Sequence, residues 1–141
     1  MPRQYWLVKS EPDTYPWERL QKEGRAVWDG VRNFMARNNL RAMKEGDIAL
    51  FYHSNVGKEI VGAAKVVREA YPDPTAKGED WSVVDLAPAF AFKKPVTLEV
   101  MRKQSSLEGF KLITHPRLSV VPVSPEHFAT ILALGETKAP K

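Results

Sequence analysis

The chain has no cysteine among its 141 residues. Thiolate catalysis, zinc–thiolate sites, iron–sulfur clusters and disulfides are therefore excluded, and a reducing, intracellular compartment is expected. No apolar run approaches the length of a membrane span, and the N-terminus enters a strand-like pattern without the hydrophobic region of a signal peptide. We expect a soluble, cytoplasmic protein, or a nuclear one if the host is eukaryotic.

Catalytic motifs are also lacking. The sequence has no glycine-rich phosphate loop, no G-x-G-x-x-G and no G-x-S-x-G, and the histidines at 53, 115 and 127 do not have metal-ligand spacing. His53 beside Ser54 suggests a hydrolase, but adjacent strand residues point to opposite faces and do not easily form a nucleophile–base pair. We expect no catalytic residue, no metal and no cofactor.

The length fits one domain that buries about two thirds of its unfolded surface. We find no internal repeat, low-complexity segment or long linker. The chain is therefore expected to form a single domain over residues 1–135, with a disordered tail over 136–141, and to be a monomer.

Basic residues favour an anionic partner. The formal net charge is +4, and positive charge clusters in the sequence rather than spreading evenly. The closest cluster comprises Arg25, Arg32, Arg37, Arg41 and Lys44.

Alternating apolar residues and breakers predict the elements of the first half. Residues 5–9 form a strand, residues 16–23 a helix that stops at Gly24, and residues 47–53 a strand covered on both sides. Residues 59–68 are the returning strand. The run Gly62-Ala63-Ala64 within it indicates a sharp bend or the close approach of another element.

The second half is predicted in the same way. Residues 81–92 form a strand that Lys93-Lys94-Pro95 ends, after a surface loop over 71–80. Residues 97–103 are ambiguous between a strand and a two-turn helix capped by Thr97. Residues 118–123 form a strand in which Pro122 suits a sheet edge, and Ser124-Pro125 begins a last helix that ends at Gly135.

Residues 26–43 carry more polar groups than a scaffold segment needs. Trp28 offers a flat stacking surface, and Arg32, Asn33, Asn38 and Asn39 offer donors and acceptors for a base edge or a phosphate. The alternative is that Trp28 is a core residue and the asparagines are helix caps.

Two other short segments have the composition of recognition sites. Lys9-Ser10-Glu11 follows the first strand with a cation, a hydroxyl and a carboxylate, and Arg117-Leu118-Ser119 begins a later strand with a guanidinium and a hydroxyl. Both patterns are also common on solvated surfaces.

Six motifs, in order over nearly the whole chain, resemble those of the EVE domain family. They are residues 6–12 (WLVKSEP), 28–33 (WDGVRN), 36–43 (ARNNLRAM), 51–55 (FYHSN), 69–73 (EAYPD) and 117–120 (RLSV). The resemblance implies an α+β, mostly β, PUA-like fold: a strongly curved mixed β-barrel with flanking helices, related to YTH and ASCH domains.

The resemblance also implies a function. YTH domains hold a methylated base in an aromatic cage, and EVE domains are associated with modified cytosine in DNA, such as 5-methylcytosine or 5-hydroxymethylcytosine. The cage tryptophan of YTH domains lies in a Gly-Val-Trp-Ser context that residues 26–29 resemble. Trp28 is therefore the expected stacking platform.

The remaining site residues follow from the same resemblance. The base-binding pocket is expected to contain Trp28, Lys9, Ser10, Glu11, Val31, Asn33, Asn38, Asn39, Tyr52, His53, Ser54, Leu118 and Ser119. The phosphate or rim contacts are expected from Arg32, Arg37, Arg41 and Arg117. The short loop over 73–80 leaves the second cage aromatic open: Trp81 either supplies it or belongs to the core.

The expected partner is thus nucleic acid, and the resemblance puts modified DNA ahead of RNA. The residues themselves do not separate the two, because none of them identifies a contact to a 2′-hydroxyl. Two alternatives stay open. One is a small-nucleotide-binding protein or enzyme that uses Glu11 or His53 as acid or base. The other is an interaction module whose partner binding is insensitive to salt, unlike phosphate binding.

Overall fold

The computed structural model describes residues 3–13, 15–29, 31, 33–54, 57–75 and 81–138. Six strands form one mixed sheet in the order β2-β5-β4-β3-β1-β6. Only the β1–β3 pair is parallel among the described strands. The strands are β1 (Tyr5–Ser10), β2 (Ala26–Val27), β3 (Ile48–His53), β4 (Glu59–Pro72), β5 (Ser82–Thr97) and β6 (Val120–Val123).

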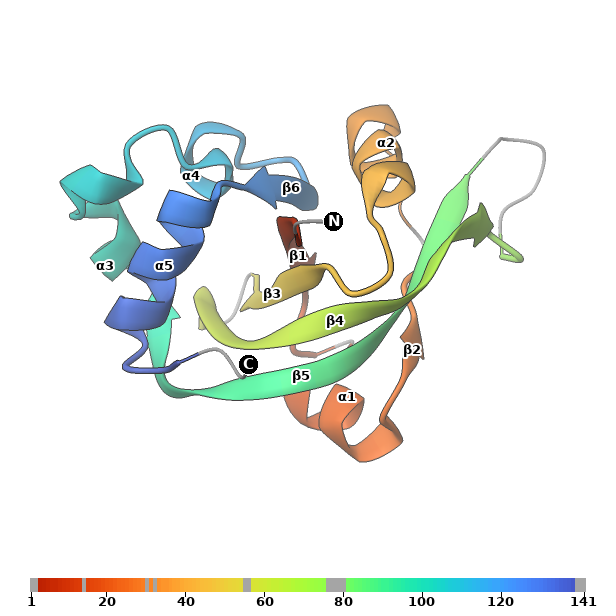
Figure 1. The fold of residues 1–141 in the computed structure, drawn as a ribbon, viewed down its shortest axis with the longest axis horizontal. Helices are drawn as coiled ribbons and strands as arrows, with labels where there is room; N and C mark the ends of the chain where they lie inside the picture. The colour runs from red at the N-terminus through yellow and green to blue at the C-terminus, as the bar shows by residue number, and fades with distance from the viewer. Residues whose placement is uncertain are drawn as a thin grey trace.

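The sheet is strongly curved, and the two long strands β4 and β5 sweep across the molecule (Figure 1). Register shifts in the β3–β4 and β4–β5 pairs, between Phe51 and Tyr52 and between Ile60 and Gly62, mark bulges that bend the strands. The predicted curvature is confirmed. The ladder is open, because β2 and β6 lie at its two ends and no pairing joins them among the described residues.

Helices flank the sheet on several sides (Figure 1). Helix α1 lies below β5 in this view, α2 stands above the sheet, and α3, α4 and α5 gather at the opposite end from the tips of β4 and β5. The helices are α1 (Trp17–Glu23), α2 (Phe34–Ala42), α3 (Leu98–Arg102), α4 (Lys111–Thr114) and α5 (Pro125–Leu134), with a 3-10 turn η1 (Ser105–Leu107). No helix among the described residues is both long and apolar enough to span a bilayer.

Local signals placed most helix ends correctly. Gly24 ends α1 in the left-handed conformation with φ 77°, and the hydroxyl of Thr97 accepts a hydrogen bond from Val100 N, which caps α3. Ser124 and Pro125 begin α5 as predicted. Of the two structures that the sequence leaves open for residues 97–103, the helix is thus confirmed and the strand is wrong.

Two strand ends were predicted wrongly. Strand β5 continues through Lys93-Lys94-Pro95, and Val96 pairs with Ile60. Pro95 is tolerated because β2, the other neighbour of β5, pairs only with Asp85 and Leu86, so β5 has no partner strand on that side near Pro95. Strand β4 likewise extends to Pro72, into the predicted loop. The rest of that loop, residues 76–80, lies outside the described residues.

The core is made of residues from all six strands and from the helices packed against them, and it includes the central strands β1, β3 and β4. Leu50 and Phe51 are completely buried, which confirms that β3 is covered on both sides. Leu7 and Val8 of β1 are completely buried as well. Proline 122 lies in β6, at the sheet edge, as predicted.

Gly62 is the small residue that the close approach requires. A Cβ atom at this position would lie 2.6 Å from Cε2 and Cζ2 of the Trp17 indole. The absence of a side chain on β4 therefore lets the first residue of α1 pack against the sheet, where Trp17 also contacts Phe51 at 5.3 Å between ring centroids.

Gly62→Ala is expected to lower the free energy of unfolding by about 1–3 kcal/mol, because the new methyl group overlaps a buried ring. Urea denaturation followed by circular dichroism measures this loss. In a Trp17→Phe background the same substitution should cost clearly less, since the smaller ring leaves room and carries no buried, unpartnered indole N–H. An equal loss of stability in both backgrounds would contradict the close contact between Gly62 and the Trp17 ring.

Candidate functional site

A cavity of about 760 Å³ opens where the end of β1, helix α1 and strand β2 meet. Its volume lies within the range of small-ligand sites, about 300–1,000 Å³. It is lined by Lys9, Ser10, Glu11, Tyr15, Arg19, Glu23, Arg25, Ala26, Val27, Trp28, Asp29, Val31 and Ser119. Residues from three separate parts of the chain thus share one hollow.

Two aromatic rings stand in the cavity wall. Trp28 and Tyr15 lie edge to face, with centroids 6.1 Å apart and an interplanar angle of 88°. The half-buried indole also packs against Phe51 at 5.6 Å, and the Trp28 backbone N–H donates to Val84 O at 2.8 Å. Trp28 is held on two sides, which fixes the orientation of its ring.

The phenol of Tyr15 is fixed by charged neighbours on α1. Its hydroxyl donates to Glu23 Oε1 at 2.7 Å, and Arg19 Nε donates to Glu23 Oε2 at 3.1 Å. The Arg19 guanidinium also lies 4.8 Å from the Tyr15 ring centroid. Burial, then the bond to Glu23, raises the pKa of Tyr15 to about 12. The phenol therefore stays protonated at neutral pH and stays a donor.

The end of β1 forms another part of the cavity wall. The Ser10 hydroxyl donates to the carbonyl of Tyr15, which ties β1 to the segment that leads into α1. Lys9 Nζ donates to Pro116 O at 2.7 Å, and the Lys9 backbone N–H donates to Ser119 O at 3.0 Å. Burial lowers the pKa of the Lys9 ammonium from its ordinary value. An ammonium has three donors, so Lys9 keeps hydrogen atoms for a ligand.

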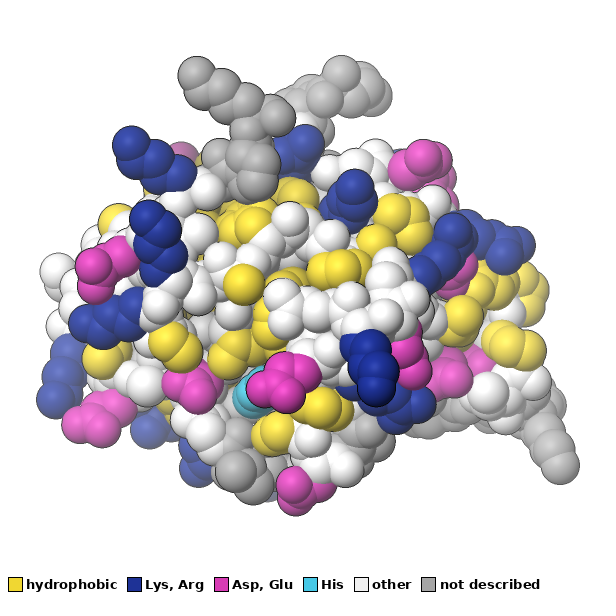
Figure 2. Space-filling model, turned by 90° about the horizontal axis from the view of Figure 1, so that it is seen from below, with side chains coloured by type: hydrophobic (Ala, Val, Ile, Leu, Met, Phe, Trp, Pro, Cys, Tyr) yellow, Lys and Arg dark blue, Asp and Glu magenta, His cyan; other side chains and the backbone are white. Residues whose placement is uncertain are grey.

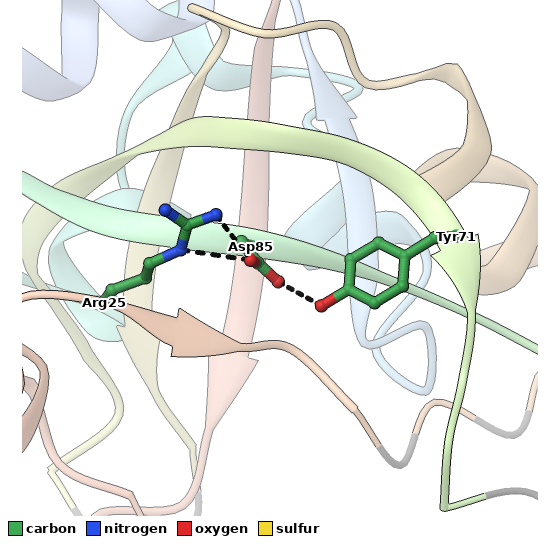
Figure 3. Close-up of polar contacts among 3 residues, drawn as sticks. All are labelled: Arg25, Tyr71 and Asp85. Atoms are coloured by element: carbon green, nitrogen blue, oxygen red, sulfur yellow. Dashed lines mark hydrogen bonds and ion pairs between the residues drawn. The ribbon is translucent and has the colours of Figure 1, made fainter.

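The Arg25 side chain is held by the buried carboxylate of Asp85 (Figure 3). Asp85 on β5 accepts from Arg25 Nε at 3.0 Å and from Arg25 Nη2 at 2.7 Å, both on Oδ2. Its other oxygen accepts from the Tyr71 hydroxyl on β4, and this bond raises the pKa of Tyr71. Two long strands and the segment before β2 are joined at this one carboxylate.

His53 does not line the cavity but is bonded to the first residue of α1. Its Nε2 accepts a hydrogen bond from the Trp17 backbone N–H at 3.0 Å, a bond that requires the neutral imidazole at this nitrogen. Burial is the main cause that lowers the pKa of His53. Ser54 meets the site only through its backbone N–H, which donates to Ser10 O.

Six of the residues named from the sequence line the cavity: Lys9, Ser10, Glu11, Trp28, Val31 and Ser119. The three asparagines do not. Asn33 caps α2 by accepting from Ala36 N at 3.0 Å, Asn39 donates to Val120 O at 2.7 Å, and Asn38 accepts from the Arg37 guanidinium. These amides stabilise α2 and attach it to β6.

Four other named residues lie elsewhere. Tyr52 is 4% exposed and points into the core, where burial raises its pKa. Leu118 and Arg117 line a second cavity of about 310 Å³, together with Asn33, Met35, His115 and Pro116. Arg41 donates to the Ser82 hydroxyl at 2.8 Å. Arg32 lies outside the described residues.

The sequence did not identify the α1 side of the cavity. Tyr15, Arg19, Glu23 and Arg25 were missed, although the Arg19–Glu23 spacing of four residues is a signal for a helical pair. Trp81 is 8% exposed and stacks on Phe34 at 5.1 Å instead of lining the cavity. The ring that accompanies Trp28 there is Tyr15.

Charge near this side of the molecule is mixed. The face seen from below in Figure 1, on which α1 lies, carries hydrophobic side chains between acidic and basic ones rather than a field of one sign (Figure 2). Within the described part of the chain, no group of three His, Asp or Glu side chains is placed to hold a metal ion.

Comparison with known proteins is consistent across sequence and structure. The EVE domain family model matches residues 4–134. The chain is 39% identical over 168 aligned positions to mouse thymocyte nuclear protein 1, covering 95% of this chain and 74% of that protein. The crystal structure of Atu2648 from Agrobacterium tumefaciens superposes with a TM-score of 0.93 at 41% identity, covering 98% of this chain and 99% of the other.

A human relative has been solved with nucleic acid. The structure of the human THYN1 protein in complex with DNA that contains 5-methylcytosine is similar to this chain, with a TM-score of 0.87 and 34% identity over 96% of this chain and 99% of that one. The ASCH domain of Zymomonas mobilis has a TM-score of 0.61 at 10% identity, which shows a shared fold alone. The predicted PUA-like fold is confirmed.

The bond between Trp17 and His53 predicts acid sensitivity. Because folding lowers the His53 pKa below its ordinary value of 6.5, the unfolded chain binds more protons between the two values, and the free energy of unfolding falls as pH drops below about 6.5. Well above that pH, His53 is neutral in both the folded and the unfolded chain and does not make the free energy of unfolding depend on pH. Urea denaturation at steps from pH 5 to pH 8 measures it.

His53→Gln serves as the comparison, because its amide oxygen can accept the Trp17 N–H but does not titrate. The variant should lose less stability than the wild type between pH 7 and pH 5. Identical losses in both proteins would exclude His53 as the source.

Proposed function

Because this chain belongs to the EVE domain family, we propose that its 760 Å³ cavity binds a modified base of a nucleic acid, most favourably a modified cytosine in DNA, without catalysing a reaction. The observation that carries the proposal is the perpendicular Trp28–Tyr15 pair beside the polar end of β1. The human relative solved with 5-methylcytosine DNA supports the ligand class.

The cavity has the two components that base recognition needs. The rings of Trp28 and Tyr15 offer apolar faces, and stacking of a base on an aromatic ring contributes about 1–3 kcal/mol. Lys9, which uses only one of its three hydrogens on Pro116 O, supplies donors near them. A base must leave its stack to enter, at a cost of a few kcal/mol, so single strands and destabilised pairs should bind best.

Discrimination of the modification has to come from fit. Transfer of one methyl group from water to an apolar surface contributes only about 0.8 kcal/mol. The rigid placement of Trp28 against Phe51 and Tyr15 supports selectivity, because rings that cannot move cannot adapt to a base of another shape.

Two carboxylates in the lining suit cytosine in particular. Glu11 and Asp29 both line the cavity, and neither side chain has a hydrogen-bond partner among the residues that the structure describes. Carboxylates accept from the exocyclic amine of cytosine, whereas thymine and uracil offer an oxygen there. We assign Glu11 to this amine, because it follows directly on Lys9 and Ser10 at the end of β1.

Trp28→Ala is expected to weaken binding of an oligonucleotide with one 5-methylcytosine by about 10- to 100-fold, since the stacking surface is lost. Fluorescence anisotropy with labelled strands carrying cytosine, 5-methylcytosine, 5-hydroxymethylcytosine or N6-methyladenine, as DNA and as RNA, measures the affinity and names the preferred base.

The matched control is Trp6→Phe, which alters an indole that is buried outside the cavity and donates to Asp47 Oδ2 at 3.0 Å. It should lose stability but keep the base preference. If all strands bind alike and Trp28→Ala changes nothing while both variants stay folded, the proposal fails and the small-nucleotide alternative takes its place.

Glu11→Gln is expected to abolish a preference for cytosine over thymine or uracil, because the new amide can accept from the exocyclic amine of cytosine and can equally donate to the O4 oxygen. One such edge contact discriminates by about 1–3 kcal/mol. The same anisotropy assay, with the central base changed between 5-methylcytosine and thymine, gives the ratio of affinities.

Asp29→Asn makes the same chemical change on another part of the lining. It should leave the ratio as in the wild type. A shifted ratio in Asp29→Asn with none in Glu11→Gln would transfer the role to Asp29, against our assignment.

A further inference from the structure

One apolar surface of the molecule lies outside the cavity and has no role in the site described above. Phe34, the first residue of α2, is 58% exposed, more than the other large hydrophobic residues of the described chain. One side of its ring stacks on the buried Trp81, with centroids 5.1 Å apart and planes 12° from parallel. An aromatic ring thus lies at the surface on a rigid aromatic support.

The support leaves Phe34 open on one side. The Arg37 guanidinium lies 5.0 Å from the Phe34 ring and 5.8 Å from the Trp81 ring. With the 5.1 Å between the two rings, these distances form a nearly equilateral triangle. Arg37 is therefore on the Trp81 side of Phe34, which agrees with the exposure of the remaining ring surface.

The chemistry around the exposed ring is basic. Helix α2, Phe34–Ala42, contains Arg37 and Arg41 and no acidic residue. The Arg41 guanidinium contacts the Ser82 hydroxyl, one residue from Trp81. A ring edged by guanidinium groups suits a base with its phosphate, because the base stacks while the phosphate meets positive charge.

The ring is also within reach of a strand whose base occupies the cavity. Val27 pairs with Asp85, and Trp28 N donates to Val84 O, so Trp28 lies level with this part of β5. Trp81 precedes Val84 by three residues, which corresponds to about 10 Å along an extended strand. Consecutive nucleotides of a B-form strand are about 3.4 Å apart and spread further when unstacked.

We propose that Phe34 is a second base-stacking position, which takes a base of the same strand one to three nucleotides from the base in the cavity, with Arg37 and Arg41 beside its phosphates. The occupant is a nucleic-acid strand, and the inference rests on the proposed function of the cavity. The α2 face then extends recognition from one base to a short stretch of strand.

The test compares two single-stranded DNA 12-mers with a central 5-methylcytosine. One has normal bases on both sides, and the other has abasic sites at the three positions on each side. Phe34→Ala should weaken binding of the first strand fivefold or more and leave binding of the second within twofold of the wild type. Abasic flanks alone should weaken the wild type by a similar factor.

Met35→Ala is the matched control, because Met35 is the neighbouring residue on α2 and is 56% exposed. It should bind both strands like the wild type. Trp28→Ala should weaken both strands, which separates failure of the cavity from failure of the outer position.

Three results would overturn the inference. Phe34→Ala could bind both strands like the wild type while Trp28→Ala binds neither, in which case the cavity proposal stands alone. Met35→Ala could lose as much as Phe34→Ala, which would indicate a general apolar contact. Sedimentation could show that Phe34→Ala dissociates a dimer without changing DNA affinity, which would make this face a protein interface. If Trp28→Ala also bound both strands like the wild type, the proposed function of the cavity would fail together with this inference.

Discussion

The candidate site depends on the way α1 packs against the curved sheet. Trp17 occupies the space that Gly62 leaves free, and its backbone N–H is bonded to His53 at the end of β3. Tyr15, in the segment that leads into α1, is tied to β1 through the Ser10 hydroxyl. Helix α1 and the turn before it supply Tyr15, Arg19 and Glu23 to the cavity. A shift of α1 on the sheet would therefore move these three side chains together.

The Arg25 side chain of the cavity is held in place by residues that do not line the cavity themselves. Asp85, 4% exposed, holds Arg25 and is itself bonded by Tyr71 (Figure 3). A buried carboxylate with both oxygens occupied is costly to disturb, so the guanidinium keeps its place before any ligand arrives. Binding to groups already in position costs less conformational entropy than binding to mobile ones.

The asparagines of the 33–39 segment illustrate the limit of a motif. The segment is part of what makes the chain recognisable, and its amides were read as groups that contact a base. In the structure Asn33 caps α2 and Asn39 bonds to β6, which are roles set by the ends of a helix and the edge of a sheet. A motif can thus identify a family through residues that hold its fold, while the residues around Trp28 line the cavity.

The sequence by itself determined what depends on near neighbours: five of the six strands, though not the full length of β4 and β5, the caps of α3 and α5, the turn at Gly24, the need for a small residue at Gly62, and the family. It also named Trp28, Lys9, Ser10 and Glu11, which line one cavity. Only the tertiary structure showed that Tyr15, Arg19, Glu23 and Arg25 line the same cavity. Contacts such as the bond from the Ser10 hydroxyl to Tyr15 O and the bonds from Arg25 to Asp85 place these residues there, and local sequence patterns carry no information on such contacts.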